Sequence, residues 1–194
     1  MNSDPAFRAA CALIQSFESC RLSPHLDTVA SGPNRAIYDI GWGSLTMPDG
    51  SSVTVTSGMI SQTQADQMLA DHVAAVLASV RAMVHAQVTD HQLAALTSLA
   101  YNVGTSALRG STLLRDLNMG RLEDAAVGFM SFVYAGRPPH FIQGLFNRRQ
   151  EEKALFQLDV PGPTVARPAA ATASSSPSTA DDLNAAELRR IKGT

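Results

Sequence analysis

The chain has 194 residues, of which 45% are hydrophobic and 16% are charged, and its formal net charge is −2. This composition is typical of a globular protein with a hydrophobic core. It argues against nucleic-acid binding, because the fifteen basic residues form no cluster large enough to follow a phosphate backbone. It also predicts no membrane span, because no apolar run approaches the roughly 20 residues that a spanning helix needs.

Two features bear on the compartment in which the chain is made. Cys11 and Cys20 are expected to lie on opposite faces of one helix, too far apart for a disulfide, so we predict free thiols and a reducing compartment. The N-terminal residues include an acid and no long apolar stretch, which predicts no secretory signal. We therefore expect the chain to accumulate in the cytoplasm of the cell that makes it.

The first predicted element is an amphipathic helix. Asp4 is expected to cap it, with Pro5 at its first position. An apolar stripe with helical spacing then follows, formed by Phe7, Cys11 and Ile14. The next position on this stripe holds Glu18, and Pro24 should end the helix soon after. The pattern therefore places a glutamate on the core-facing side of a helix end.

Such a position changes what the Glu18 carboxyl can do. Partial burial and the negative end of the helix dipole both disfavour its ionised form. A carboxyl that stays protonated near neutral pH can act as a general acid. The alternative is a structural glutamate whose head group pairs with an arginine such as Arg21, and the helix pattern alone leaves both interpretations open.

The next residues predict a small β-hairpin. Residues 27–35 form a turn-rich loop, and residues 36–47 are expected to form a strand. A turn at residues 48–50 and a second strand at 53–55 complete the hairpin. A hairpin of this size is too small to be stable alone, so it should pack against helices.

The residues that follow predict helices as far as position 158. Ser61 and Gln64 form a capping box before the longest periodic run, at residues 62–84, which is suited to join two lobes. Further helices are expected at residues 89–104, 111–120, 122–134 and 141–158. The expected fold is α+β and mostly helical, with a small β-hairpin lobe, a long linking helix and a helical C-terminal lobe. His72 and His85 on the long helix lack the spacing of metal ligands, so we expect no metal and no cofactor.

The composition changes after residue 160. Residues 161–180 are rich in Pro, Ala and Ser and predict a disordered linker. Residues 181–194 form a short tail that could be helical. This tail is expected either to stay solvated or to become ordered when it binds a partner. The predicted domains are thus a catalytic domain at 1–160, the linker and the tail.

Four segments in a fixed order carry a family pattern. The first segment comprises FESCRL at residues 17–22, Leu26-Asp27 and IGWG at residues 40–43. The second is QLAALTSLAYNVG at residues 92–104, and the third is GSTLLR at residues 110–115, followed by Leu117-Asn118 and Gly120. The fourth comprises Gly144-Leu145, Arg148-Arg149 and Glu152. Together they resemble the phage-type lysozyme (endolysin) family of glycoside hydrolases. The resemblance covers about residues 10 to 158.

The resemblance implies a lysozyme-like, two-lobed fold with the substrate cleft between the lobes. It implies hydrolysis of the β-1,4 bond between N-acetylmuramic acid and N-acetylglucosamine in peptidoglycan, with Glu18 as general acid and Asp27 as second carboxylate. The family's reaction is inverting. The implied partner is the peptidoglycan glycan strand, and we expect a monomer. An endolysin made in the host bacterial cytoplasm would reach the periplasmic cell wall only after a separate membrane lesion.

The sequence departs from the family beside the predicted catalytic carboxylates. Asp39 stands where the family has a threonine that helps to place the attacking water, Ser44 replaces a histidine, and the link from Asp27 to Asp39 is longer. Asp39 therefore either activates the water, alone or together with Asp27, or is a structural replacement. We include it among the catalytic candidates.

The predicted substrate-binding residues are Trp42, Asn102 and Arg148. Trp42 could stack on a sugar or belong to the core, and Asn102 lies in the family's Asn-Val-Gly segment.

The arginine pair at residues 148–149 has two interpretations. The resemblance implies that Arg148 or Arg149 holds Glu18 in place. The alternative is ion pairs with Glu151 or Glu152 near the end of the helix.

Two other functions compete with hydrolysis. A lytic transglycosylase would need Glu18 alone and no activated water, which fits the loss of the threonine. If the chain is instead a non-catalytic peptidoglycan-binding module, Asp39 indicates that the catalytic activity has been lost.

Overall fold

The chain divides into two units, Met1–Val160 and Pro161–Thr194. The computed structural model describes residues 3–27, 36–136 and 138–158, all of which belong to the first unit. The predicted linker and tail lie outside the described residues, and the predicted domain boundaries stay predictions.

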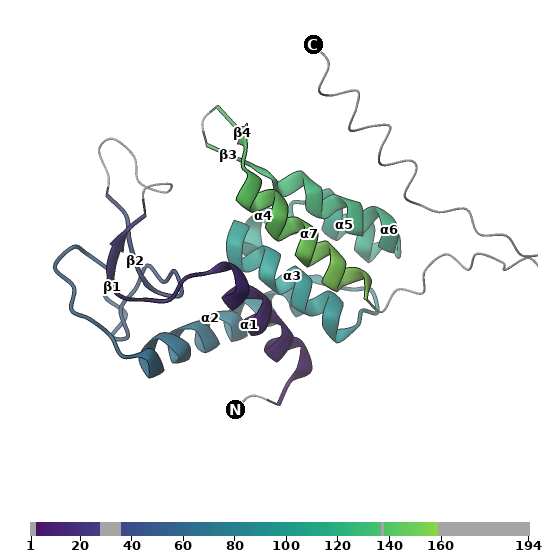
Figure 1. Ribbon diagram of the computed structural model, residues 1–194. Coiled ribbons are helices and arrows are strands. Elements are labelled where there is room, and N and C mark those ends of the chain that lie inside the picture. The colour runs from purple at the N-terminus through teal and green to yellow at the C-terminus, as the bar shows by residue number, and fades with distance from the viewer. Residues whose placement is uncertain (1–2, 28–35, 137, 159–194) are drawn as a thin grey trace, which may run out of the picture. The chain divides into compact units, whose positions relative to one another are not determined.

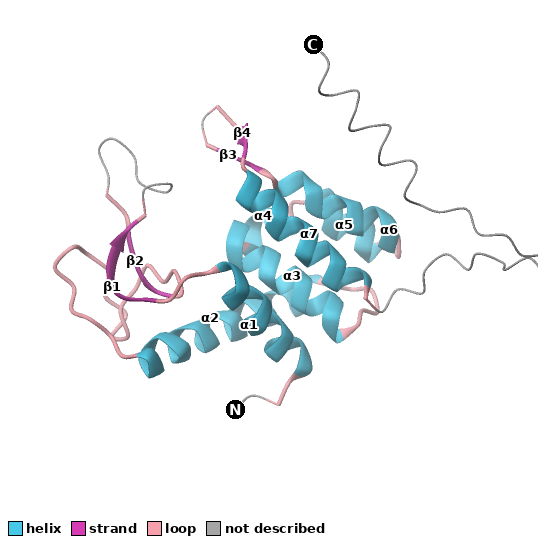
Figure 2. Cartoon of the chain, in the orientation of Figure 1, coloured by secondary structure: helices cyan, strands magenta, loops and turns pink. Residues whose placement is uncertain are grey.

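The described residues are mostly helical, with a small β-lobe, as predicted (Figures 1 and 2). The elements in chain order are α1 (Pro5–Phe17), β1 (Arg21–Leu26), β2 (Tyr38–Gly41), α2 (Gln62–Met83), α3 (Asp90–Val103), α4 (Thr105–Arg109), α5 (Thr112–Asn118), α6 (Leu122–Gly128), the 3-10 helix η1 (Phe129–Phe132), β3 (Tyr134–Ala135), β4 (His140–Phe141) and α7 (Gln143–Gln157). The α+β class is confirmed.

Helix α1 begins as predicted and ends one residue earlier than its apolar stripe suggested. The Asp4 side chain accepts hydrogen bonds from the backbone N–H groups of Ala6 and Phe7, and it also pairs with Arg81 of α2 at 2.8 Å. The buried face packs in a cluster with residues of α2 and α3. The helix ends at Phe17, so Glu18 is its C-cap, with extended backbone, and not a member of the helix.

The β-lobe differs from the predicted hairpin. The paired strands are β1 and β2, which are antiparallel. The expected pairing of residues 36–47 with 53–55 is limited to a hydrogen bond from the Val53 N–H to the Leu45 carbonyl oxygen, beside a bridge between Thr46 and Ser52 around the predicted turn. Pro24 did not mark a helix end but lies within β1. A proline is tolerated there because each strand of a two-stranded sheet has an unpaired edge, and because the register is irregular between Arg21 and His25.

Helix α2 links the lobes, as predicted. Its capping box at Ser61 and Gln64 is formed. Its buried side chains enter three different clusters: Ala65 packs with the β-lobe, Leu69 and Val73 with α1, and Val80 with the helical lobe. The helix is therefore the shared support of both lobes.

The helical lobe is built around α3, most of whose residues are buried. The helix expected over residues 122–134 is wrong in part, because α6 ends at Gly128 and continues as η1. Gly128 lies so close to α5 that an added Cβ would meet the Leu113 Cβ at 2.8 Å, and this close approach requires glycine. The break predicted at residues 136–139 falls between β3 and β4, an antiparallel pair that the sequence analysis did not predict.

Candidate active site

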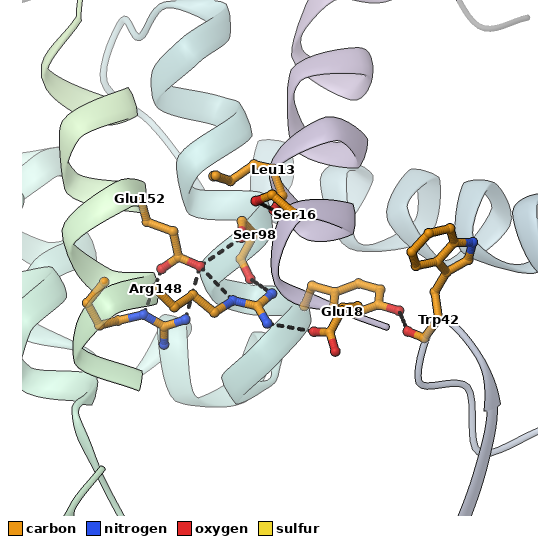
Figure 3. A network of polar contacts seen from close by, with 9 residues as sticks. Leu13, Ser16, Glu18, Trp42, Ser98, Arg148 and Glu152 are labelled. Atoms are coloured by element: carbon orange, nitrogen blue, oxygen red, sulfur yellow. Dashed lines mark hydrogen bonds and ion pairs between the residues drawn. The ribbon is translucent and has the colours of Figure 1, made fainter. Parts of the chain in front are cut away.

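Glu18 is held where α1 gives way to the β-lobe. Its backbone N–H donates to the Ile14 carbonyl oxygen at 3.1 Å, which fixes its position at the helix end. Its side chain is 27% exposed, and Oε1 lies 2.6 Å from Nη1 of Arg148 on α7 (Figure 3). The carboxyl is partly buried, as the apolar stripe predicted, although Glu18 follows the helix and does not belong to it. Its head group pairs with an arginine, as the structural alternative expected, but the partner is Arg148 and not Arg21.

Arg148 is fixed by groups on every side. Its Nε lies 3.2 Å from Oε1 of Glu152, its Nη2 donates to the Ser98 carbonyl oxygen at 3.5 Å, and its guanidinium lies 5.3 Å from the centre of the Phe17 ring. The residue is 4% exposed. Because these contacts leave the guanidinium little freedom, Arg148 presents one nitrogen to Glu18 in a fixed direction.

Glu152 anchors this network from inside the helical lobe. It is fully buried, accepts a hydrogen bond from Ser98 Oγ at 2.7 Å, and pairs with Arg149 at 2.8 Å. Burial raises the pKa of Glu152, which both arginines oppose, and burial lowers the pKa of Arg149. The two interpretations of the arginine pair therefore both hold in part: Arg148 holds Glu18, and both arginines pair with Glu152. The sequence analysis assigned no role to Ser98, although a serine among the apolar residues of a predicted helix is a signal that could have found it.

The second oxygen of Glu18 faces the β-lobe at Gly43. A Cβ added to Gly43 would lie 3.9 Å from Glu18 Oε2, and the backbone φ of 89° favours glycine. The absence of a side chain leaves Oε2 open on this side. One oxygen of the carboxyl is therefore bound to arginine, and the other borders the space above Gly43.

Tyr101 joins the segment around Gly43 to α3. Its hydroxyl donates to the Trp42 carbonyl oxygen at 2.9 Å. Burial, together with the charge of Glu18, raises the pKa of Tyr101 to about 12, so the hydroxyl stays a neutral donor at physiological pH. The tyrosine therefore holds the backbone next to Gly43 in place beside the catalytic candidate.

Glu18 lies between two hollows. The larger, of about 990 Å³, is lined by Phe17, Asp27, Asn102 and Arg148 together with residues of η1, β3 and α7. The other, of about 590 Å³, extends from Gly43 through Gly50 to α2 and α3. Glu18 itself lines neither hollow, but its carboxyl contacts Arg148, which lines the first, and lies beside Gly43, which lines the second.

Asp27 and Asn102 share the larger cavity with Arg148, although they come from different elements. Asp27 follows β1, and its backbone N–H continues the strand pairing by donating to the Ile37 carbonyl oxygen at 2.9 Å. Asn102 lies near the end of α3 and is exposed. Three of the sequence-predicted site residues are thus brought together by the fold.

Asp39 shares a face of the hairpin with Asp27. It is paired in register with His25, whose Nδ1 lies 3.6 Å from Asp39 Oδ2. Residues two apart on a strand, and residues opposite each other on paired strands, point to the same side of a sheet. His25, Asp27 and Asp39 therefore lie on one side of the β-lobe. Asp39 does not line either of the two hollows, and His25 was missed by the sequence reasoning.

Trp42 is not among the residues that line either hollow, although its neighbour Gly43 lines the smaller one. Its indole Nε1 donates to Asp66 Oδ1 at 2.8 Å, and its ring packs against both the α1 cluster and the β-lobe cluster. This is the core position that the sequence left open, and a sugar contact through Trp42 stays a prediction.

The part of the chain that the structure describes also bears on metal ligands, membrane spans and cysteines. Within that part, no group of three or more His, Cys, Asp or Glu side chains could hold a metal ion. None of the helices there is long and apolar enough to cross a membrane. Cys11 and Cys20 are free, and burial raises the pKa of Cys11 to about 11.

Comparison with known proteins identifies the family. The phage lysozyme family model matches residues 15–152, a range that includes every candidate described above. The chain belongs to the phage lysozyme family. It is 38% identical over 154 residues to an endolysin of Bacillus phage PZA, and 36% identical over 128 residues to an endolysin of Salmonella phage P22. These matches cover 79% and 66% of the chain and 55% and 84% of the two relatives. With the Bacillus phage endolysins, the chain spans only about half of the relative's length.

Solved structures of phage lysozymes have the same fold. An endolysin from Escherichia coli O157:H7 phage FAHEc1 matches with a TM-score of 0.70 and 27% identity over 80% of this chain and 94% of that one. A P22 lysozyme mutant matches with a TM-score of 0.62 and 32% identity over 76% and 94%. The muramidase domain of SpmX from Asticcacaulis excentricus matches with a TM-score of 0.63 and 28% identity over 77% and 95%. The lysozyme-like fold expected from the resemblance is therefore confirmed.

Proposed function

We propose that this phage lysozyme family member hydrolyses the β-1,4 bond between N-acetylmuramic acid and N-acetylglucosamine in peptidoglycan, as an endolysin. One observation carries the proposal. The Glu18 carboxyl has one oxygen fixed by buried Arg148, which lines one hollow, and the other beside Gly43, which lines the second. An acid in that position can reach the oxygen that links two rings.

In the proposed reaction, Glu18 gives its proton through Oε2 to the glycosidic oxygen as the bond to the anomeric carbon breaks. A water attacks that carbon from the opposite face and loses a proton to a carboxylate on the β-lobe. Asp27 lines the cavity and is the first candidate for this base. Asp39 shares its side of the hairpin and is the second, with His25 placed to hold its carboxylate.

The site of action follows from the substrate. We propose that the enzyme acts on the periplasmic cell wall as a monomer, after another agent has opened the membrane, and that Asn102 binds the glycan in the larger cavity.

The test compares three isosteric variants with the parent on purified cell walls. Glu18→Gln should abolish clearing while thermal unfolding stays close to that of the parent. Asp27→Asn and Asp39→Asn should each lower the rate at least ~10-fold, and Glu123→Gln, at an exposed carboxylate on α6, is the control that should not. Clearing by Glu18→Gln at the parent rate would refute the assignment, and parity of Asp39→Asn would return Asp39 to a structural role.

The products decide between hydrolysis and the rival transglycosylase reaction. This rival needs Glu18 alone and no activated water, which fits the aspartate at position 39 in place of the family's threonine. Hydrolysis leaves a reducing end on the released sugar, whereas the transglycosylase leaves a 1,6-anhydro ring. Mass spectrometry of the digested wall separates the two by the mass of one water. Binding without any cleavage would instead support the non-catalytic wall-binding module.

A further inference from the structure

The β3–β4 hairpin carries aromatic rings that the hydrophobic core does not use. Tyr134 is 60% exposed and Phe141 is 47% exposed. Neither they nor Phe146, at the start of α7, belong to the hydrophobic clusters found among the described residues. Folding therefore does not explain why three large rings gather at this edge of the helical lobe.

The rings support one another in a short row. Tyr134 and Phe141 are cross-strand partners, and their ring centres lie 6.1 Å apart at an interplanar angle of 74°. Phe141 in turn lies 5.7 Å from Phe146, at 54°. Offset and edge-to-face pairs of this kind are attractive. The tyrosine ring is therefore held before any ligand arrives, which lowers the entropy cost of binding.

The row is continuous with the candidate active site. Tyr134 lines the same cavity as Asp27, Asn102 and Arg148, and its strand neighbour Ala135 and Ile142 line it too. Figure 1 shows the hairpin beside the N-terminal end of α7, the helix that supplies Arg148. An exposed ring at the rim of this cavity would meet the part of a bound chain that extends away from Glu18.

We propose that Tyr134, supported by Phe141, is a stacking platform for a sugar ring of the glycan strand, which makes it a specificity-determining residue of the site. This rests on the proposed function in taking the glycan as the ligand. A pyranose ring presents a face of C–H groups that packs on an aromatic ring, while its hydroxyl and acetamido groups need polar partners. The same cavity offers both, because Ser131, Asn102 and Asn147 line it beside Tyr134.

The experiment measures binding separately from cleavage. The full chain carrying Glu18→Gln is titrated with glycan strands freed of their stem peptides by an amidase, and affinity is measured by calorimetry. Adding Tyr134→Leu, which keeps an apolar side chain but removes the ring, should weaken binding about tenfold. Adding Tyr134→Phe, which keeps the ring, should leave the affinity near that of the Glu18→Gln background, as should the control Val127→Ala, at an exposed apolar residue on α6.

Three results would overturn the platform. The first is equal affinity of the Tyr134→Leu and Tyr134→Phe chains, and the second is no binding of peptide-free strands. The third comes from a parallel titration with strands that keep their stem peptides, and is a loss of affinity in Tyr134→Leu that is seen only with those strands. Thermal unfolding of each variant shows whether the hairpin change disturbs the fold. Failure of the proposed function is distinguishable, because a chain with intact Glu18 that does not cleave walls could still bind strands through Tyr134.

Discussion

The arginine pair on α7 allows the positioning of Glu18 to be separated from the stability of the helical lobe. Arg148 and Arg149 both pair with buried Glu152, but Arg148 also binds Glu18. Removal of either arginine leaves buried Glu152 with one guanidinium partner instead of two. We predict that Arg148→Met and Arg149→Met are destabilised to a similar extent and differ in activity.

The magnitude follows from burial. Arg149 and Glu152 have no exposed side-chain surface, and Arg148 has 5%. Removal of one partner from a buried ion pair costs about 3–5 kcal/mol when the remaining charge has no other partner. Here the other arginine still pairs with Glu152, so this range is the upper limit. At about 2–4 °C for each kcal/mol in a domain of this size, the unfolding midpoint should fall by at most about 6–20 °C. A domain with about 5–15 kcal/mol of total stability retains a folded state at low temperature in most of this range.

Activity should separate the two variants. With Arg148→Met, Glu18 loses its 2.6 Å contact and the direction of its carboxyl, and we expect kcat to fall about 100-fold. With Arg149→Met, that contact is intact, so kcat should fall less than about tenfold. Wall clearing is measured below both unfolding midpoints, after circular dichroism has shown that each variant is folded. Equal loss of activity in the two variants would refute the positioning role of Arg148 and reduce it to a structural one.

Two further predictions concern contacts that hold α1 and the β-lobe in place. Arg81 donates to Asp4 and holds the pKa of Asp4 below its ordinary value of 3.8, so this stabilisation is present above pH 3.8 and lost as the pH falls through the lowered pKa. Asp4→Asn keeps the helix cap but loses the ion pair, and should lower the free energy of unfolding by up to about 1 kcal/mol at neutral pH. Urea unfolding at a series of pH values should show that the difference in unfolding free energy between variant and parent vanishes in acid. A difference that stays constant with pH would contradict the linkage. Tyr101→Phe should cost about 0.5–1.5 kcal/mol by removing the bond to the Trp42 carbonyl. Because the pKa of Tyr101 is about 12, this cost should not change between pH 6 and 9, and a change in that range would contradict the assigned donor.

The sequence determined the features that depend on near neighbours. The capping boxes at Ser61 and Thr89 fixed where α2 and α3 begin, because their hydrogen bonds join residues three apart. The same is true of the cap at Asp4. Glu18 could be singled out for the same reason, since its spacing from Phe7, Cys11 and Ile14 can be seen in the sequence, although the helix ends one residue before it.

Local patterns failed where distant segments decided the outcome. The pairing of β1 with β2 depends on which segment lies opposite β1 in the folded chain. Only when that partner is known can Pro24 be assigned to a strand with an unpaired edge and not to the end of a helix. The end of α6 at Gly128 depends on how closely α5 approaches it. Neither the strand partner nor the separation of the two helices can be predicted from the residues that are near in the sequence.

The candidate site shows the same division. The sequence supplied Glu18 and an arginine pair 130 positions further along the chain, but it could not say which arginine reaches the carboxyl. That choice was made by the packing of α7 on α3, which directs Arg148 toward Glu18 and leaves Arg149 with Glu152 inside the lobe. Tyr134 likewise reads as an ordinary aromatic residue in the sequence, and only the tertiary structure sets it on the wall of the same cavity as Asp27. Residue chemistry is local, whereas the direction in which a side chain points across a cleft is set by the elements packed behind it.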